Sequence, residues 1–248
     1  MRKKRNKKTK MTKTITKPRF EEIKAITTIN LPDDELVFNA QRVGPMNFAG
    51  LRQADYGLGF RMPIMPELVP LVYACLENNE YKTAKDVIKT LRSNWLTGNT
   101  GILYVPKGMY VQDNPELKDG RISMNQKVLE KRLGKNEEKG VVFSDDKTIR
   151  FTPYNYKRKS QSSLDLSKNT GIVALVGGEE NAEKLAKVSE HYKMNPYFWA
   201  MENVDSPQTR VAVLGSLGFG GGLYVVAGGS EYGDDGFSFG VQKIEKKK

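Results

Sequence analysis

The most informative part of this chain is residues 211–242, which read VAVLGSLGFGGGLYVVAGGSEYGDDGFSFGVQ. This stretch contains no lysine or arginine, although the chain of 248 residues has 40 of them. Residues 215–240 contain ten of the 23 glycines. A segment so poor in basic residues and so rich in glycine differs from the rest of the chain, and it is the first place to look for a functional surface.

The middle of this stretch alternates as a β-strand does, with successive side chains on opposite faces. The apolar members are expected to face a core and the others to face outward: Leu223, Val225 and Ala227 inward, and Tyr224, Val226 and Gly228 outward. Glycines on an outward face leave shallow hollows. Rigid aromatic side chains among small residues are typical of recognition surfaces.

Two other interpretations of the glycines remain open. The first is a β-rich end of the core whose glycines serve bulges and turns. The second is a phosphate-binding loop at residues 218–222, which read GFGGG. The spacing disfavours this loop, because no lysine follows as in GxxxxGK[ST] and Leu223 stands where GxGxxG needs its last glycine.

The net charge of +11 comes from the two ends of the chain. Residues 1–19 hold ten basic and no acidic residues, and residues 243–248 carry +3, which leaves −2 for residues 20–242. Like charges repel, and the first segment has almost nothing apolar to bury. The sequence therefore predicts a disordered basic arm at residues 1–19 and a basic tail at residues 245–248.

The composition excludes several classes of protein. The single cysteine, Cys75, rules out an intramolecular disulfide and a cysteine-cluster metal site, and the single histidine, His191, rules out a multi-histidine zinc site. No apolar run approaches the ~18 residues that a membrane helix needs. The basic amino terminus lacks the apolar segment of a signal peptide, so the sequence alone predicts a cytoplasmic location. No cofactor is expected.

The spacing of apolar residues predicts a mixture of helices and strands. The expected helices span about 66–75, 82–95, 123–132 and 179–191, and the expected strands and hairpins lie at about 23–29, 101–112, 141–151 and 171–177. Residues 154–169 are polar and are expected to form a loop. Trp95 and Trp199 are assigned to the core, with the alternative that residues 195–199 flank a ligand face.

Three short motifs occur in order along the chain. They are Gly59-Phe-Arg-Met-Pro-Ile-Met-Pro-Glu-Leu before the first long helix, Leu214-Gly-Ser-Leu, and Gly236-Phe-Ser-Phe-Gly-Val-Gln. Together they resemble the C-type lectin-like fold, in the branch used by variable proteins of diversity-generating retroelements. The segment that begins at Trp95 is similar to archaeal members. The resemblance covers residues 20–244 and implies an α+β domain with small antiparallel sheets, two or more helices and a C-terminal variable region at about 211–242.

The resemblance also implies how the composition of this region arose. Such families mutate adenines in Asn-type codons, which can then encode Tyr, Phe, Gly, Ser, Asp, Val and other residues, but not Lys, Glu, Gln, Met or Trp. Between Val211 and Val241 only Glu231 lies outside the reachable set. The absence of lysine then follows from the codons and needs no explanation from charge repulsion. Glu231 is expected to be a position that is not diversified.

The resemblance implies a binding function without enzymatic activity, in which a stable scaffold presents variable side chains to a ligand. The ligand-binding positions carried over are Phe219, Gly221, Gly222, Tyr224, Val226, Gly228, Gly229, Tyr232, Gly233 and Asp234. The positions carried over as invariant support are Leu214, Leu217, Leu223, Val225 and Ala227. The implied ligand is a protein or a cell-surface molecule, so the cell surface becomes an alternative location.

Calcium binding and catalysis are disfavoured by the residues themselves. The chain lacks the EPN or QPD loop and the WND strand of calcium-dependent lectins, so the acidic residues at 231, 234 and 235 are expected to form a solvated turn. His191 is expected to cap a helix or lie on the surface, and Cys75 to be buried as a small hydrophobic residue. A single cysteine also argues against the oxidase chemistry of formylglycine-generating enzymes, which use paired cysteines.

The basic arm supports a second class of function. A segment with a charge of +10 can bind nucleic acid or an anionic membrane surface without specificity. Residues 1–19 contain no aromatic side chain that could stack on bases, so sequence-specific recognition is not expected. A solvated tail without a partner remains the alternative.

Overall fold

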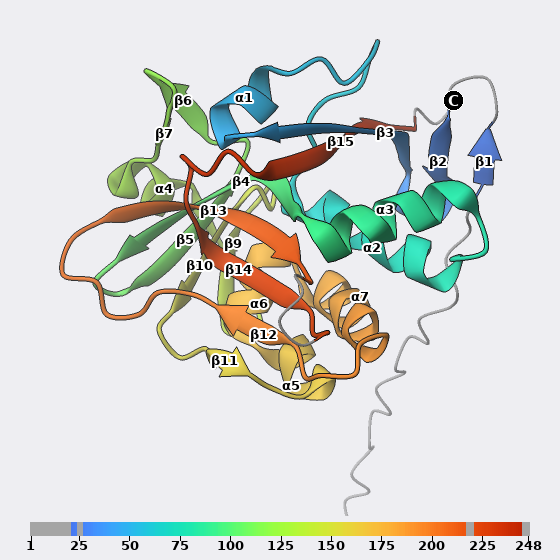
Figure 1. The fold of residues 1–248 in the computed structure, drawn as a ribbon. Helices are drawn as coiled ribbons and strands as arrows, with labels where there is room; N and C mark the ends of the chain where they lie inside the picture. Colours follow the sequence, from blue (N-terminus) through green and yellow to red (C-terminus); the bar gives the residue numbers. More distant parts are fainter. Residues whose placement is uncertain (1–20, 24–26, 217–220, 245–248) are drawn as a thin grey trace, which may run out of the picture.

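The structure is a computed structural model, and it describes residues 21–23, 27–216 and 221–244 (Figure 1). The predicted basic arm at residues 1–19 and the predicted basic tail at residues 245–248 lie outside these described residues. Helices and mostly antiparallel strands are mixed along the chain, so the fold class is α+β, as the sequence predicts.

A branched sheet of thirteen described strands forms the frame of the molecule. Its main path runs in the order β1 (Glu21–Ile23), β2 (Thr28–Leu31), β3 (Leu36–Met46), β15 (Gly236–Lys243), β4 (Trp95–Val105), β13 (Gln208–Gly215), β14 (Tyr224–Gly229), β12 (Tyr197–Trp199) and β11 (Lys159–Ser160). Its branch comprises β5 (Gly108–Asp113), β10 (Ile149–Pro153), β9 (Val141–Ser144) and β8 (Leu133–Glu138). A separate hairpin consists of β6 (Glu116–Lys118) and β7 (Arg121–Ser123).

The branch arises at β4, which pairs with different strands along its length. Trp95 and Leu96 pair in parallel with the start of β15, whereas the residues from Thr100 onward pair antiparallel with β5. On its other edge β4 pairs with β13. This arrangement places the C-terminal strands β15 and β13 on opposite edges of one central strand, with β14 on the far side of β13.

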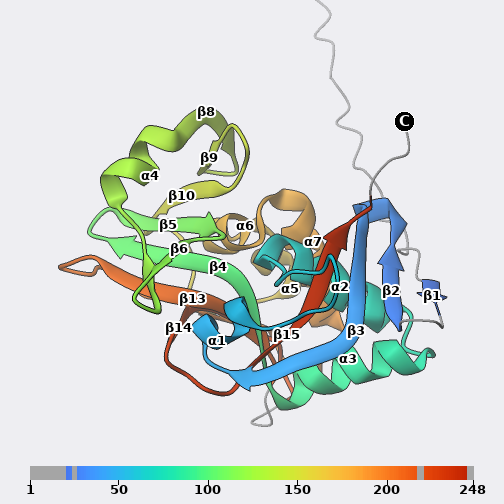
Figure 2. The same cartoon turned by 90° about the horizontal axis from the view of Figure 1, so that it is seen from above.

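The helices gather mainly on one side of the sheet (Figures 1 and 2). They are α1 (Phe48–Gln53), α2 (Met65–Glu77), α3 (Lys82–Ser93), α4 (Gln126–Arg132), α5 (Ser163–Lys168), α6 (Thr170–Val176) and α7 (Glu179–Glu190), with a 3-10 turn at Pro32–Asp34. Helix α2 contacts α3, α6 and α7. Among the described residues no helix has both the length and the apolar character needed to cross a membrane.

Helix α2 is buried on nearly all sides, and the buried residues include the predicted apolar stripe of Leu68, Leu71, Val72 and Cys75. Two motif residues fix its start. The guanidinium of Arg61 donates two hydrogen bonds to the Glu67 carboxylate, at 2.6 and 2.9 Å. The same carboxylate accepts a hydrogen bond from the amide of Ile64 at 3.0 Å, which satisfies an amide that the first turn leaves without a partner.

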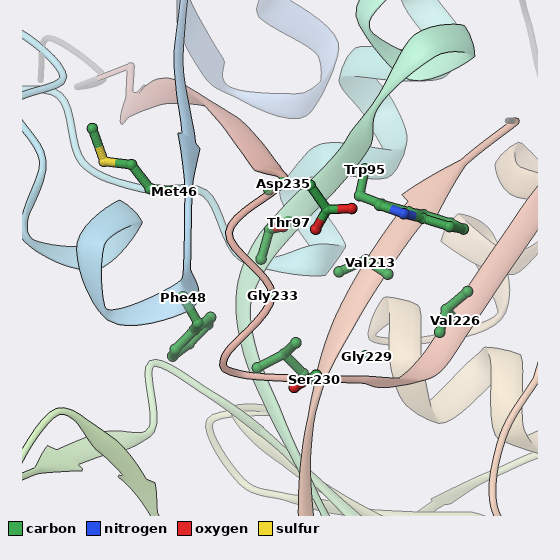
Figure 3. Close-up of a pocket in the computed structure, with 12 residues that line it drawn as sticks. Met46, Phe48, Trp95, Thr97, Val213, Val226, Gly229, Ser230, Gly233 and Asp235 are labelled. Carbon is green, nitrogen blue, oxygen red and sulfur yellow. The ribbon is translucent and has the colours of Figure 1, made fainter.

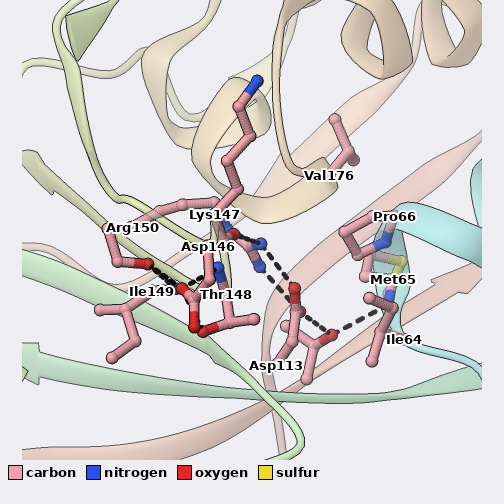
Figure 4. Close-up of polar contacts among 12 residues, drawn as sticks. Ile64, Met65, Pro66, Asp113, Asp146, Lys147, Thr148, Ile149, Arg150 and Val176 are labelled. Carbon is pink, nitrogen blue, oxygen red and sulfur yellow. Dashed lines mark hydrogen bonds and ion pairs between the residues drawn. The ribbon is translucent and has the colours of Figure 1, made fainter. Parts of the chain in front are cut away.

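A buried ion pair connects the branch of the sheet to this helix (Figure 4). The guanidinium of Arg150 donates to both oxygens of the Asp113 carboxylate, at 2.6 and 2.8 Å, and both side chains are almost fully buried. The hydroxyl of Thr100 donates to Asp113 at 2.8 Å and accepts from the amide of Met65 at 2.9 Å. One continuous set of polar contacts therefore runs from β10 through β5 and β4 to the first residue of α2.

The predicted strand at residues 171–177 is wrong, because this segment forms helix α6. Every residue from Gly171 to Val176 is buried, so the segment has no polar face whose spacing could reveal a helix. The local signals lie at its ends. The Asn169 side chain accepts a hydrogen bond from the Gly171 amide at 3.0 Å, and Gly177 ends the helix with φ of 84°.

Other boundaries differ in smaller ways from the predictions. The predicted hairpins at residues 101–112 and 141–151 are confirmed as β4–β5 and β9–β10. The predicted loop at residues 154–169 contains β11 and α5, and the side chain of Ser162 caps α5 by accepting from the Asp165 amide. Helix α3 ends at Ser93, because Trp95 pairs with β15 and begins β4.

Candidate ligand-binding face

Strand β14 shows the alternation that its sequence predicts. Leu223, just before the strand, and Val225 and Ala227 within it are fully buried, whereas the outward residues Tyr224, Val226 and Gly228 are half-buried. The hydroxyl of Tyr104 donates a hydrogen bond to the Ala227 carbonyl at 3.0 Å. The core side of β14 is thus held by packing and by a buried hydrogen bond, and its other side is open to a ligand.

Aromatic residues from outside residues 211–242 extend this open side. Strand β12 pairs in parallel with β14 and places Tyr197 beside Tyr224 and Trp199 beside Val226. The rings of Tyr197 and Tyr224 lie 5.9 Å apart between centroids. Trp95, at the start of β4, lies on the same side. We call these six residues the outward face: Trp95, Tyr197, Trp199, Tyr224, Val226 and Gly228.

The prediction that both tryptophans lie in the core is wrong for Trp199, whose exposed fraction is 44%. Trp95 is only half-buried. The physical reason is that β12 alternates as β14 does, with Phe198 fully buried between two residues that point outward. The alternative interpretation, that residues 195–199 flank the face, agrees with this placement.

The six residues of the outward face line a shallow, open cavity of ≈ 310 Å³. Its walls are four aromatic rings, one valine and the backbone of one glycine, so it can contact an apolar or aromatic group but offers little hydrogen bonding. We call it the aromatic cavity.

A second cavity, of ≈ 170 Å³, shares Trp95 and Val226 with the first (Figure 3). Phe48 and Val213 supply further apolar walls, and Asp235 contributes a carboxylate. We call it the Asp235 cavity. Its position between β13, β14 and the start of β15 places one acidic group in otherwise largely apolar surroundings.

Two glycines allow the tryptophans to lie close to the sheet. A Cβ atom added to Gly228 would lie 1.4 Å from a ring carbon of Trp199, and one added to Gly215 would lie 2.7 Å from a ring carbon of Trp95. Both distances are far below van der Waals contact. Any other residue at these positions must therefore displace the indole ring or the strand.

The loop between β14 and β15 contains the acidic residues of the region. The Glu231 carboxylate accepts a hydrogen bond from the amide of Ile122 at 2.9 Å, so it is tied to the β6–β7 hairpin. Asp234 and Asp235 are exposed. Within the described residues no group of three or more potential metal-ligating side chains comes together, and these acids form no cluster of that kind.

Five of the ten predicted ligand-binding residues line the two cavities: Tyr224, Val226, Gly228, Gly229 and Gly233. Tyr232 is 59% exposed and has the guanidinium of Arg121 5.7 Å from its ring centroid. Gly229 ends β14, and Gly233 and Asp234 lie in the loop that follows it. Gly221 is exposed before β14, whereas Gly222 is buried against residues 194 and 195. Phe219 and the predicted support residue Leu217 lie outside the described residues, as does most of the GFGGG segment.

The two residues considered for catalysis have structural roles. Cys75 is fully buried, and burial raises the pKa of its thiol, as expected for a small hydrophobic residue. His191 follows the last residue of α7, and its Nε2 atom lies 2.9 Å from a carboxylate oxygen of Glu77. Neither residue lines the aromatic cavity or the Asp235 cavity.

Comparison with known proteins identifies the fold. The chain is similar to a solved structure described as the accommodation of massive sequence variation in Nanoarchaeota by the C-type lectin fold, with a TM-score of 0.52 and 18% sequence identity. The similarity covers 82% of this chain and 96% of that chain. It establishes that this chain has the C-type lectin fold, as its motifs predict. No protein family and no curated protein matches the sequence.

Proposed function

We propose that this chain is a non-enzymatic binding protein whose C-terminal region, residues 211–242, is diversified by a retroelement. The observation that carries the proposal is the alternation of β14. The side chains that hold the core and those that meet the solvent are separated onto two faces of one strand. Substitutions at Tyr224 and Val226, on the outward side, can therefore change the surface while the buried side keeps the fold.

The position of Glu231 supports the same proposal. Glutamate is the one residue between Val211 and Val241 that mutation of Asn-type codons does not produce. Its carboxylate holds the loop to Ile122, which lies outside the diversified stretch. The residue that anchors the loop is thus the one residue of this stretch that mutation of Asn-type codons does not produce.

The ligand that suits this surface is a protein or a cell-surface molecule. The outward face consists of aromatic and small residues, which provide contact area with little loss of side-chain entropy. Rigid aromatics are also the residues that most often dominate binding energy at protein interfaces. The described residues of the face supply no pair of acidic and basic groups arranged for proton transfer, and the proposed role is binding alone.

A genomic observation tests the diversification directly. We expect a second copy of the sequence that encodes residues 211–242 near the gene, beside a gene for a reverse transcriptase. The two copies should differ mainly where the template copy has adenine, and the Glu231 codon should be identical in both. A genome with no such repeat removes the retroelement from the proposal and leaves only the binding surface.

A selection experiment tests the binding surface. Peptides are selected from a random phage-displayed library on the whole protein and then measured on Val226→Arg, which places a long charged side chain across both cavities. The matched control is Val128→Arg, the same substitution at a site on α4 that is 53% exposed. We expect selected peptides to lose at least about tenfold in affinity on the first variant only. Equal binding to both variants would reject the outward face as the site.

A further inference from the structure

We propose that the Asp235 cavity receives a cationic side chain, arginine or lysine, from the protein ligand. This inference rests on the proposed function, because it names the chemistry that the same surface selects. Asp235 is not among the positions that the sequence resemblance carries over as ligand-binding. The structure brings it to the site because the loop returns between β14 and β15.

The charge distribution favours a cation. Residues 211–242 contain three acidic and no basic residues, and Glu231 already accepts a hydrogen bond from the scaffold. Asp235 forms no ion pair with any residue in the described part of the chain. Two arginines occur near the loop, but the guanidinium of each lies over an aromatic ring: Arg121 over Tyr232 and Arg42 over Phe237. The carboxylate is therefore available to a charge from outside.

The walls of the cavity favour a cation for a second reason. In Figure 3 the Asp235 carboxylate lies between Trp95 and Thr97, and all three residues line the same cavity. A ligand that fills the cavity removes water from the carboxylate, and an uncharged ligand leaves that charge without a partner. A guanidinium or ammonium group pairs with the charge and can also rest on the indole of Trp95.

The two cavities together define how such a ligand lies. Trp95 and Val226 line both, so a chain that places its cation beside Asp235 continues over the aromatic cavity. There it meets Tyr197, Trp199 and Tyr224, which suit an apolar or aromatic neighbour of the cation. The specificity we infer is a basic residue next to an apolar one in an exposed segment of the partner.

Tryptophan fluorescence measures this binding, because the two tryptophans of the chain both lie on the outward face. The full-length protein is titrated with acetyl-Gly-Arg-Gly-amide and with the same tripeptide containing citrulline, which has the shape of arginine without its charge. The variant is Asp235→Asn. The control is Asp205→Asn, which removes an exposed carboxylate outside both cavities.

We expect the arginine peptide to bind in the millimolar range and at least about fivefold more tightly than the citrulline peptide. Asp235→Asn should abolish this preference, and Asp205→Asn should keep it. Equal binding of the two peptides, an unchanged preference in Asp235→Asn, or no saturable binding up to about 50 mM would each overturn the inference. The proposed function is tested separately: library peptides that bind the outward face without an essential basic residue would reject only the cationic specificity.

Discussion

The carboxylate of Glu231 accepts a hydrogen bond from the backbone amide of Ile122, with 2.9 Å between the two atoms, across 109 positions of sequence. The carbonyl of Glu231 also accepts from the amide of Phe48 at 3.4 Å. One residue of the β14–β15 loop is thereby tied to both the β6–β7 hairpin and the start of α1. The loop that carries Tyr232, Gly233 and Asp235 is held by its neighbour at position 231.

Replacing this anchor should loosen the loop. Glu231→Ala removes the acceptor and leaves the amide of Ile122, a buried residue, without its partner. Hydrogen bonds that involve a charged group contribute roughly 1.5–3 kcal/mol, so we expect a loss of about 1–2 kcal/mol at this partly exposed site. Native-state hydrogen exchange should show faster exchange of the Ile122 amide. Glu231→Gln, which keeps an acceptor, should lose less than half as much protection, and equal losses in the two variants would contradict the anchoring role.

Gly228→Ala should displace the indole of Trp199. An added Cβ would lie 1.4 Å from a ring carbon, which no side-chain adjustment of alanine can relieve. We expect a shift in tryptophan emission and a destabilisation of about 1–3 kcal/mol, measured by urea unfolding. The same substitution made in a Trp199→Ala background should cost less than about 0.5 kcal/mol, because the obstructing ring is gone. A cost that does not depend on Trp199 would place the conflict in the backbone instead.

Arg150→Met should destabilise the protein strongly, because it leaves the buried Asp113 carboxylate without its cation. Removal of one partner of a buried ion pair typically costs about 3–5 kcal/mol, and we expect a loss in that range by urea unfolding. Lys187→Gln is the matched control, since Lys187 and Glu190 form an exposed pair on one helix. That change should cost less than about 0.5 kcal/mol. Similar losses in the two variants would show that the buried pair has no special importance.

The basic arm provides a separate prediction from the sequence. A segment with ten basic and no acidic residues should give weak binding to nucleic acid that falls steeply with salt. A gel shift at several salt concentrations, with the full chain and with residues 1–19 removed, measures this binding. The truncated chain should lose it, and binding that survives truncation would assign it to another part of the surface.

The sequence predicted well those features that depend on a periodic pattern. The alternation of β14 follows from residue spacing and is confirmed by burial, and α2 forms where the spacing of apolar residues predicts a helix. The pattern was ambiguous where a segment is apolar on every side. The pattern predicts a strand where helix α6 forms, because six consecutive buried residues have no polar face and the caps at Asn169 and Gly177 are weak signals in a linear sequence.

The candidate site was predicted only in part, because only part of it lies in one stretch of chain. Tyr224, Val226 and Gly228 were identified from their own alternation. Trp199 was missed as an outward residue because its three-residue strand is too short for periodicity to place it. Asp235 gave no signal beyond a turn residue, since its importance depends on the apolar walls around it.

By itself, the sequence determined which side of β14 faces the core, because periodicity is a local property. It also determined that Glu231 is the one residue of its stretch that mutated Asn-type codons do not encode, because residue type is local as well. The tertiary structure alone decided that β12 and β4 extend the face with Tyr197, Trp199 and Trp95, and that Asp235 joins them. Strand order sets these neighbours, and a parallel pairing such as β12 with β14 joins segments that no local pattern relates. The physical reason is that a surface is assembled from side chains brought together by pairing and packing over long distances in sequence.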